Sequence, residues 1–416
     1  MNFFSIIIYG YFILAGYLIY IINRDRKNAT VFFGRHKIWA TGLMIFLFMG
    51  ALVAFDAHFI EPWTIKTTPV DIKITGVATS IKIAFISDIQ VGNHKKNAWV
   101  EEITKRIQQE KPDLVILGGD QIDNEGALED ESVYLEPLRQ IAALYPTYAI
   151  MGNHEYGIGS SVVGFNQYYT GDRSAEVIER LKHLEITLLR NTLVCIDTKK
   201  PSTKAELGAG QVCLYGIDDL WGGKPDFASL TVCHPERSEG SRSVIPAMPT
   251  GRQAQAGIQS PRDSSASPQD DSCISTTTPL IFLTHNPDGI KLWPKNLRAP
   301  DLVLAGHTHG GQVWIPFFGP LGNAGISLPT KYYRGLNYYS PPVIPTGALP
   351  TGRQAAGRVE ESLSPPISRD HSTPSLRDSA RDDIPVFTSV GIGESGGAVR
   401  FWTLPEIAIL TLKPAN

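Results

Sequence analysis

Short apolar runs that each end in a cluster of polar residues recur along this chain and constrain its fold more than any other feature. A run of roughly four to eight apolar residues bounded by turn residues is typical of a buried β-strand. The runs with polar ends are residues 81–86, 112–117, 147–151, 280–284 and 301–305. Further strands are predicted at residues 70–74, 187–189, 193–196, 211–217, 386–390, 399–404 and 407–412, and helices at 97–109, 128–144 and 175–183. Strands that alternate with helices predict a layered α/β domain with a largely buried sheet.

The polar residues that follow these runs are of the kinds that bind metals. They are Asp88 and Gln90, Asp120 and Asp123, Asn153 and His154, His285, and His307-Thr308-His309. In an open α/β sheet, sites lie outside the carboxyl ends of the strands. One Asp after a strand is usually a turn or cap residue, but capping does not explain so many strand ends with Asp, Asn or His. Since imidazole is the commonest protein ligand for metals near neutral pH, we predict a metal site at this edge.

Two uncharged apolar runs lie near the amino end, at residues 3–22 and 38–55. The first run is long enough to span a bilayer as a helix. The second run is at the lower limit of the length needed to span, so a buried core helix is an alternative interpretation of it. A cleaved signal peptide would begin with a basic segment, but no basic residue precedes Arg24. We therefore predict a membrane anchor of two transmembrane helices in residues 1–56.

The connection between the two apolar runs has an excess of positive charge. Its charged residues are Arg24, Arg26, Lys27, Arg35 and Lys37 against Asp25 alone. Short loops rich in Lys and Arg stay in the cytoplasm. The connection is therefore predicted to be cytoplasmic and the domain after residue 55 extracytoplasmic, at the cell membrane.

Charge and cysteine content exclude other classes of protein. The 416-residue chain has a formal net charge of −3 and no long basic tract, which argues against a nucleic-acid partner. Its cysteines are Cys195, Cys213, Cys233 and Cys273. Because they lack the CxxC spacing of a structural zinc site or a regular disulfide framework, we predict free thiols.

Two segments differ from the rest in composition. Residues 233–276 and 341–382 are rich in Ser, Pro, Gly, Arg and Asp and contain few large apolar residues. Such segments bury too little surface to offset chain entropy, so we predict disordered insertions. The hexapeptide at residues 249–254 recurs at 350–355. A docking motif is one interpretation; we favour repeat-derived sequence tolerated in surface loops.

Three further polar positions have two interpretations each. Asp218-Asp219 could hold metal ligands in position by hydrogen bonding to them, or could form a solvated turn; we favour the turn. His183 is interpreted as a helix-end residue. Arg334 could contact a phosphate or lie on the surface as an ordinary arginine.

Taken together and in order, the polar clusters resemble the motifs of the calcineurin-like metallophosphoesterases. They read Asp88-x-Gln90, Gly119-Asp120-x-x-Asp123, Gly152-Asn153-His154-Glu155, His285 and Gly306-His307-x-His309. The resemblance covers about residues 69–414 without the insertions, which we take as one domain. Gly391-Ile392-Gly393 and Arg400 with Pro405-Glu406 resemble the membrane-associated bacterial branch of the family. The resemblance implies a four-layer α/β/β/α sandwich with a site for two metals. One difference is that Gln90 stands where the family motif has a histidine.

The resemblance also implies a role for each site residue. One metal would take Asp88, Asp120, His309 and the Gln90 carbonyl, and the other Asp120, Asn153, His285 and His307. Mixed oxygen and nitrogen ligands suit Mn, Fe, Zn or Ni. A hydroxide bridging the metals would attack phosphorus in line. His154, oriented by Asp123, would protonate the leaving alkoxide as a general acid.

Three functions follow as hypotheses. The leading one is a membrane-anchored phosphohydrolase acting on a lipid-linked or envelope phosphoester, such as a phospholipid or a nucleotide-linked glycolipid. The second is a cytoplasmic-facing pyrophosphatase of lipid biosynthesis, which requires the opposite topology. The third is a binding or regulatory protein in which Gln90 disables one metal site. Neither an oligomeric state nor a preference for mono- or diesters is predicted.

Overall fold

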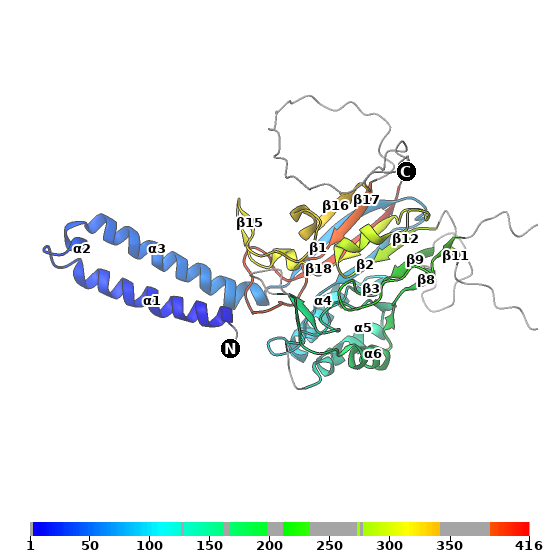
Figure 1. The fold of residues 1–416 in the computed structure, drawn as a ribbon, viewed down its shortest axis with the longest axis horizontal. Helices are drawn as coiled ribbons and strands as arrows, with labels where there is room; N and C mark the ends of the chain where they lie inside the picture. Colours follow the sequence, from blue (N-terminus) through cyan, green and yellow to red (C-terminus); the bar gives the residue numbers. More distant parts are fainter. Residues whose placement is uncertain are drawn as a thin grey trace, which may run out of the picture.

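The computed structural model describes residues 3–125, 129–160, 167–197, 211–232, 273–274, 278–341 and 383–415. Within these ranges, a pair of long helices extends from a layered α/β domain (Figure 1). The predicted insertions lie outside the described residues, except for residues 273–274 and 341, and so do both hexapeptides. Their disorder stays a prediction.

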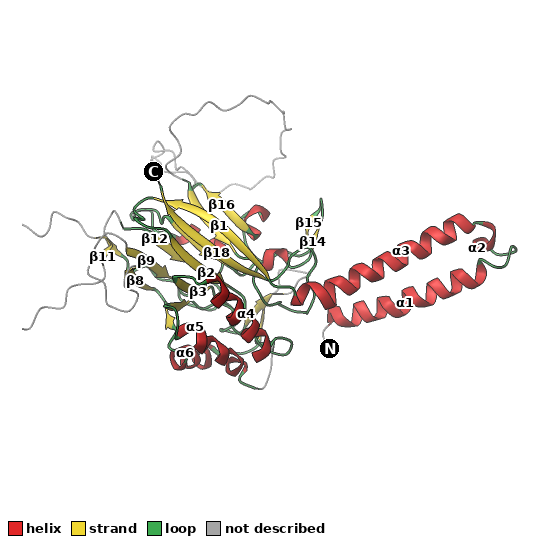
Figure 2. Cartoon of the chain, turned by 180° about the vertical axis from the view of Figure 1, so that it is seen from behind, coloured by secondary structure: helices red, strands yellow, loops and turns green. Residues whose placement is uncertain are grey.

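The amino-terminal helices form an antiparallel hairpin. Helix α1 (Phe3–Asp25) is joined through α2 (Phe32–Arg35) to α3 (Lys37–Phe55), which continues as a π-helical turn at Asp56–Ile60 and a 3-10 turn at Glu61–Trp63. By length and composition, Ser5–Asp25 and Lys37–Trp63 are candidate membrane spans. Only 11% of the most apolar window of the second span is buried. It is therefore not packed as a core helix of the domain, as Figure 2 also shows.

Two six-stranded sheets form the centre of the domain. In the first, the order is β1 (Lys66–Ile74), β18 (Glu406–Pro414), β2 (Ile81–Ile86), β3 (Leu114–Leu117), β4 (Thr147–Ala149) and β7 (Thr187–Leu188). In the second, it is β16 (Gly335–Tyr339), β17 (Ile384–Thr388), β13 (Leu302–Ala305), β12 (Leu280–Leu283), β9 (Gln211–Gly216) and β8 (Thr192–Asp197). Strands β2, β3, β4 and β7 are parallel, as are β9, β12, β13 and β17. Each set therefore ends at one edge of its sheet.

The alternation of side chains along the strands explains the layers. On β2, Ile83 and Phe85 belong to the apolar core between the sheets, whereas Ala84 and Ile86 pack against the helices, because successive strand residues point to opposite faces. The helices on the first sheet are α4 (Asn97–Glu110), the 3-10 helix Glu131–Leu138, α5 (Arg139–Ala142) and α6 (Ser174–His183). Short helical turns at Pro287–Leu292 and Thr330–Tyr333 cover the second sheet. The predicted α/β/β/α sandwich is confirmed, although its fourth layer consists of 3-10 turns.

Two predicted elements differ in the structure. Within the predicted helix 128–144, the described residues form mainly a 3-10 helix that includes Pro137, a residue without an amide hydrogen to donate. The predicted strand at 399–404 is a loop with an isolated bridge between Val313 and Phe401. Its Arg400 is fully buried and donates to the carbonyls of Val390 and Thr403 at 3.0–3.1 Å. Sequence analysis did not predict β5 (Ile158–Ser160), β6 (Gln167–Tyr169), β14 (Trp314–Ile315), β15 (Gly319–Pro320) or β16.

The prediction of free thiols is wrong for Cys195 and Cys213, which form a disulfide. The two residues lie directly opposite each other on the antiparallel pair β8 and β9, with their Cα atoms 4.0 Å apart. Sequence spacing gave no sign of this pair because strand register brings the two residues together. Cys233 lies outside the described residues.

We expect replacement of both bonded cysteines by serine to destabilise the domain. The disulfide joins residues 18 apart in sequence, and closing a loop of this size contributes about 3 kcal/mol. The Cys195→Ser/Cys213→Ser variant of the full chain should lose roughly 2–4 kcal/mol in urea unfolding. As a control, dithiothreitol should lower the midpoint of the wild type but not that of the variant. If dithiothreitol leaves the urea midpoint of the wild type unchanged, the disulfide between Cys195 and Cys213 is contradicted.

Candidate metal centre

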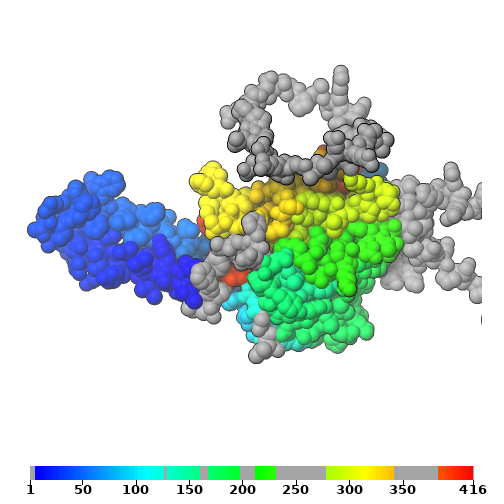
Figure 3. Space-filling model, viewed as in Figure 1, coloured from blue at the N-terminus to red at the C-terminus, as the bar shows by residue number. Residues whose placement is uncertain are grey.

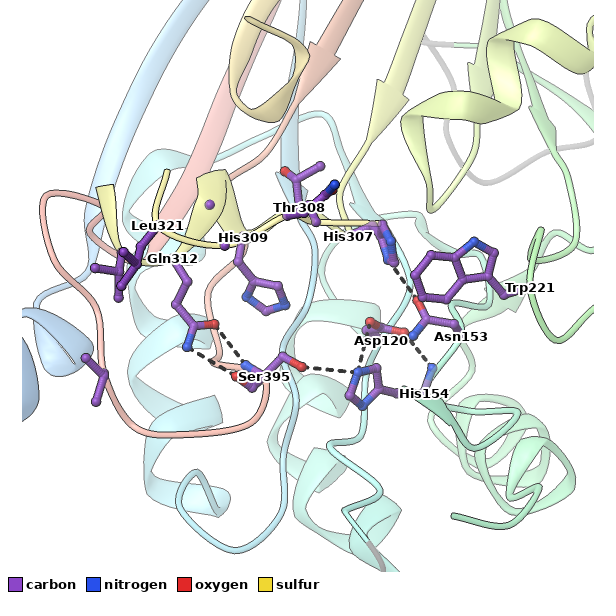
Figure 4. A pocket seen from close by; sticks show the side chains of 16 residues that line it. Asp120, Asn153, His154, Trp221, His307, Thr308, His309, Gln312, Leu321 and Ser395 are labelled. Carbon is purple, nitrogen blue, oxygen red and sulfur yellow. Dashed lines mark hydrogen bonds and ion pairs between the residues drawn. The ribbon is translucent and has the colours of Figure 1, made fainter. Parts of the chain in front are cut away.

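The structure brings all the sequence-predicted site residues to one place, at the carboxyl ends of strands from both sheets. The first sheet contributes the residues that follow β2, β3 and β4, and the second those that follow β12 and β13. All of them are buried: Asp88, Gln90, Asp120, Asp123, Asn153, His154, His285, His307 and His309. Figure 4 shows His307 pointing to Asn153, with Asp120 and His154 beside them, in a pocket that is lined by residues of both sheets.

One group of polar atoms surrounds Asp120. His285 Nε2 lies 3.0 Å from Asp120 Oδ2, and His307 Nδ1 lies 2.8 Å from Asn153 Oδ1. Asp120, His285 and His307 each offer a ligand atom within 4.8 Å of the others, which is a spacing that could hold a metal ion. These four residues are the group that sequence analysis predicted for one metal.

A second group surrounds Asp88. His309 Nε2 lies 3.4 Å from Asp88 Oδ1, and the main-chain N–H of His307 donates to both carboxylate oxygens at 3.1 Å. His285 Nε2 is 3.9 Å from Asp88 Oδ1 and connects the two groups. Gln90 approaches from the same strand end, and its Nε2 lies 3.5 Å from His154 Nε2. Asp88, Gln90 and His309, together with Asp120, are the predicted ligands of the other metal.

Several buried polar atoms in the described part of the site have no hydrogen-bond partner. They include Gln90 Oε1, His307 Nε2 and His309 Nδ1. An unsatisfied buried polar atom costs about 1–3 kcal/mol, and such atoms are rare in native proteins. Burial lowers the pKa of His307 to about 3 and that of His309 well below its usual value, so both imidazoles are neutral with a free lone pair. This set of oxygen and nitrogen donors fits divalent Mn, Fe, Zn or Ni.

Backbone strain is concentrated at the same residues. Asp88, Gln90 and Asp120 have φ values of 55°, 46° and 52°, a region that residues other than glycine seldom adopt. Strain of this kind persists where the surrounding structure enforces it, often at functional sites. Close packing contributes here, since a Cβ on Gly306 would lie 1.8 Å from Ser87 Oγ and 2.6 Å from Asp88 Oδ2. Only glycine fits at this position.

Glu155 has a structural role that sequence analysis did not assign. Its buried carboxylate accepts hydrogen bonds from the N–H groups of Asp120 at 3.1 Å, Gln121 at 2.7 Å and Gly152 at 2.7 Å. It therefore fastens the end of β3 to the end of β4 and helps to hold Asp120. The motif Gly152-Asn153-His154-Glu155 contained this residue, but nothing in the motif indicated which groups it would bind.

The favoured interpretation of Asp218 and Asp219 as a solvated turn is wrong, since each is only 1% exposed. Asp219 Oδ2 accepts from the N–H groups of Trp221 and Gly222, both at 2.7 Å. The loop held in this way places Trp221 in the pocket, with its ring 4.5 Å from that of His307. The Asp219 carboxylate therefore shapes the wall of the site.

His154 is oriented by Asp123, but through the main chain. Its Nδ1 bonds to the carbonyl oxygen of Asp123, not to the carboxylate. Its Nε2 lies 3.4 Å from Ser395 Oγ and 3.9 Å from Asp120 Oδ2, at the pocket. Burial disfavours the charged imidazole, but the Asp120 carboxylate and the Asp123 carbonyl together raise the pKa of His154 above its usual value.

Arg334 does not line the pocket. Its guanidinium stacks on the ring of Trp314, 3.7 Å from the centroid, and donates to the carbonyl of Trp402 at 3.3 Å. The phosphate-binding interpretation of Arg334 therefore has no structural support. His183 ends α6 and has an exposed side chain, as expected for a helix-end residue.

A sequence model of the calcineurin-like phosphoesterases matches residues 81–311 of this chain. This range is more than half of the chain and contains every motif from Asp88 to His309. The chain belongs to the calcineurin-like phosphoesterase family. Proteins of this family typically use divalent metals, which agrees with the cluster of Asp120, His285 and His307.

Relatives that are similar to this chain come from bacteria and animals. The chain is 26% identical over 307 residues to a metallophosphoesterase of Helicobacter pylori strain J99, which covers 72% of this chain and 63% of that protein. It is 26% identical over 242 residues to phosphodiesterase YaeI of Escherichia coli K12, covering 58% and 65%. A Bos taurus transmembrane protein with a metallophosphoesterase domain is 24% identical over 280 residues, covering 66% and 50%. The chain thus spans between half and two-thirds of the length of these relatives.

We expect Gln90 to make the metal site around Asp88 the weaker one. An amide offers a carbonyl oxygen, whereas the histidine that the family motif has here offers nitrogen, which Zn and Fe prefer. Gln90→His should raise Zn²⁺ affinity at one site by about tenfold or more, equivalent to roughly 1.4 kcal/mol, as measured by titration calorimetry with Zn²⁺ and Mn²⁺. Gln109→His on the exposed face of α4 is the control. Equal affinities and selectivity in wild type and Gln90→His would show that residue 90 is not a ligand.

Proposed function

We propose that this protein is a dimetal-dependent hydrolase of phosphoesters. The observation that carries the proposal is the convergence of carboxylate, amide and imidazole groups from both sheets on one pocket, with several of their buried atoms unpaired. A binding or regulatory protein with a partly disabled metal site is the alternative. The retention of Asp120, Asn153, His154, His285, His307 and His309 favours the enzyme.

The proposed ligand sets follow the two groups of atoms. Asp88, Asp120, His309 and the Gln90 carbonyl would hold one ion, and Asp120, Asn153, His285 and His307 the other. When bound, two such ions would supply a hydroxide for in-line attack on phosphorus and neutralise the phosphoryl oxygens. Strained backbone at Asp88 and Asp120, together with the Glu155 hydrogen bonds, would keep the carboxylates in place before the substrate arrives.

His154 is the proposed general acid. Its Nδ1–H donates to the Asp123 carbonyl, which fixes the ring and leaves Nε2 at the pocket, beside Ser395. Although burial disfavours the charged ring, the Asp120 carboxylate and the Asp123 carbonyl raise the pKa of His154, which is the direction that a general acid requires. A proton on Nε2 would pass to the departing alkoxide oxygen, as general acids do in ester cleavage.

We expect two substitutions to separate metal binding from proton transfer. Asp120→Asn should lose both bound metal and turnover, because Asp120 belongs to both ligand sets. His154→Ala should retain metal while turnover falls by about 10²–10⁴-fold. Metal content is measured by plasma mass spectrometry. Turnover is measured with added Mn²⁺ on glycerophosphocholine, whose leaving group is an alkoxide; bis(p-nitrophenyl) phosphate, whose leaving group needs little protonation, should slow much less. If His154→Ala loses metal, its role as general acid is wrong; if the wild type hydrolyses no phosphoester with any of these metals, the enzyme proposal fails.

The proposed organisation is a membrane anchor at residues 1–56 and a phosphoesterase domain at residues 69–414 that is interrupted at 233–276 and 341–382. We propose that the domain is extracytoplasmic. The positive charge between α1 and α3 supports this orientation. The disulfide between Cys195 and Cys213 adds independent support, because disulfides persist mainly in oxidising compartments outside the cytoplasm.

A lipid-linked or envelope phosphoester is the proposed substrate. Apolar side chains form much of the pocket wall, namely Trp221, Val313, Leu321, Ala324 and Val399. A pocket that combines a polar metal cluster with an apolar wall suits an amphiphilic molecule. The name of the E. coli relative, a phosphodiesterase, supports a diester. A cytoplasmic-facing lipid-biosynthesis pyrophosphatase becomes the better proposal if the topology is reversed.

We expect a cysteine in the domain to react from outside the cell. In a chain with Cys233→Ser and Cys273→Ser, Thr79→Cys should label with a membrane-impermeant maleimide in intact cells, and Ala29→Cys only after lysis. Both residues are exposed, the first between β1 and β2 and the second between α1 and α2. The reverse pattern would place the domain in the cytoplasm.

A further inference from the structure

A short hairpin beside the pocket ends in two exposed aromatic side chains. Strands β14 (Trp314–Ile315) and β15 (Gly319–Pro320) are antiparallel, and the turn between them carries Phe317 and Phe318. These two side chains are 103% and 88% exposed. We call residues 316–319 the aromatic turn. Two adjacent phenylalanines that are almost fully exposed leave a large apolar surface in water, which is typical of an interaction site.

The backbone of the aromatic turn is unfavourable for the residue it holds. Phe318 N–H donates to the carbonyl of Ile315 at 3.1 Å, Pro316 is the second residue of the turn, and Phe317 is the third with φ 69°. A type II turn has this pattern, and its third position favours glycine or asparagine. A bulky residue at positive φ is a genuine outlier. Folding gains nothing from this phenylalanine, so a contact outside the domain is its best explanation.

The aromatic turn lies on the side of the domain from which the apolar helices extend. Figures 1 and 2 show the β14–β15 hairpin projecting on that side, and in Figure 3 the yellow surface protrudes towards the blue helices. Trp402 lies in the loop that links the hairpin to the helices. It is 61% exposed and also has a positive φ, of 57°. Tryptophan is enriched where a membrane meets water.

Hydrogen bonds fix the hairpin relative to the end of the second span. Arg400 N–H donates to the carbonyl of Ala57 at 2.9 Å, and Trp402 N–H donates to the Glu61 carboxylate at 3.0 Å. Between them, Phe401 exchanges main-chain bonds with the hairpin, donating to Gln312 at 3.0 Å and accepting from Trp314 at 2.8 Å. Because these hydrogen bonds are short and mostly join main-chain groups, the end of the second span fixes the position of the hairpin and its aromatic turn.

The same hairpin forms part of the pocket wall. Val313 and Leu321, one from each side of the hairpin, line the pocket together with Gln312. Figure 4 shows Leu321 and Gln312 at the opposite end of the pocket from Trp221 and His307. The hairpin therefore connects the aromatic turn to the wall of the pocket that holds the metal cluster.

We propose that the aromatic turn inserts into the bilayer surface from which the second span emerges, so that the pocket receives an amphiphilic phosphoester directly from the membrane. The occupant of this surface is the lipid bilayer, because the exposed aromatic groups continue the apolar surface of the second span, where Phe55, Phe59 and Trp63 are also exposed. The delivery of substrate rests on the proposed hydrolase function; the insertion does not.

Lipid quenching of fluorescence tests the insertion without any measurement of activity. In the full chain reconstituted in nanodiscs, Phe317→Trp should add tryptophan emission that phosphatidylcholine brominated on its acyl chains quenches relative to unbrominated lipid. The wild type gives the background of the seven native tryptophans. Leu144→Trp, an exposed site after α5 with 61% exposure, is the matched control and should add unquenched emission. Equal quenching of the added emission in both variants, or none in Phe317→Trp, would overturn the proposal.

Turnover of two probes in the same nanodiscs tests the delivery. Phe317→Ser/Phe318→Ser should hydrolyse bis(p-nitrophenyl) phosphate like the wild type but should hydrolyse hexadecyl p-nitrophenyl phosphate about tenfold more slowly, since each phenylalanine contributes to membrane contact. Leu144→Ser/Leu292→Ser should change neither rate. Equal rates with the lipid probe, or an equal loss with both probes, would overturn the proposal. Failure of the wild type with both probes would instead remove the hydrolase function, while quenching still decides the insertion.

Discussion

The contacts of the Asp120 carboxylate are the interactions on which the rest of the site depends. Its Oδ2 lies 3.0 Å from His285 of the second sheet, and its Oδ1 accepts the His154 N–H at 2.9 Å from the end of β4 in the first. The Asp120 N–H is in turn held by Glu155. One buried carboxylate thus joins both sheets at their carboxyl edges. A buried negative charge in this position is stabilised by cations, so the fold and the proposed metal binding support each other.

A second buried network joins this centre to the apolar helices. Arg400 is fully buried, with its Nε 3.4 Å from Glu394 Oε1, and Lys95 Nζ lies 3.5 Å from the same oxygen. Burial lowers the pKa of Lys95 to about 7, although Glu394 acts against this. Buried charges of this kind add little net stability. Their value here is geometric, because Arg400 holds a carbonyl of the loop that contains Ser395 and also contacts Ala57 in the π-helical turn at Asp56–Ile60.

Much of the candidate site could be predicted because its residues follow strands in a simple pattern. Apolar runs indicate strands, and parallel strands end at one edge, so Asp88, Asp120 and His307 were expected to converge. The environment of Asp218 and Asp219 was not predictable in this way, since burial of a turn depends on the loops that pack over it. The disulfide was missed for a similar reason: the pairing of Cys195 with Cys213 follows from the register of β8 and β9, which local sequence does not specify.

The sequence by itself determined the kinds of groups available to the site, the order of the strands that carry them and the presence of two apolar runs. These properties are local, because strand formation depends on a few neighbouring residues and hydropathy on a single run. Only the tertiary structure decided which atoms meet. In the structure, His154 bonds to the main-chain carbonyl of Asp123 and not to its carboxylate. Arg334 stacks on Trp314, and the aromatic turn lies on the same side of the domain as the end of the second span. Such contacts join residues far apart in the chain, and their geometry follows from how the two sheets and their loops pack together.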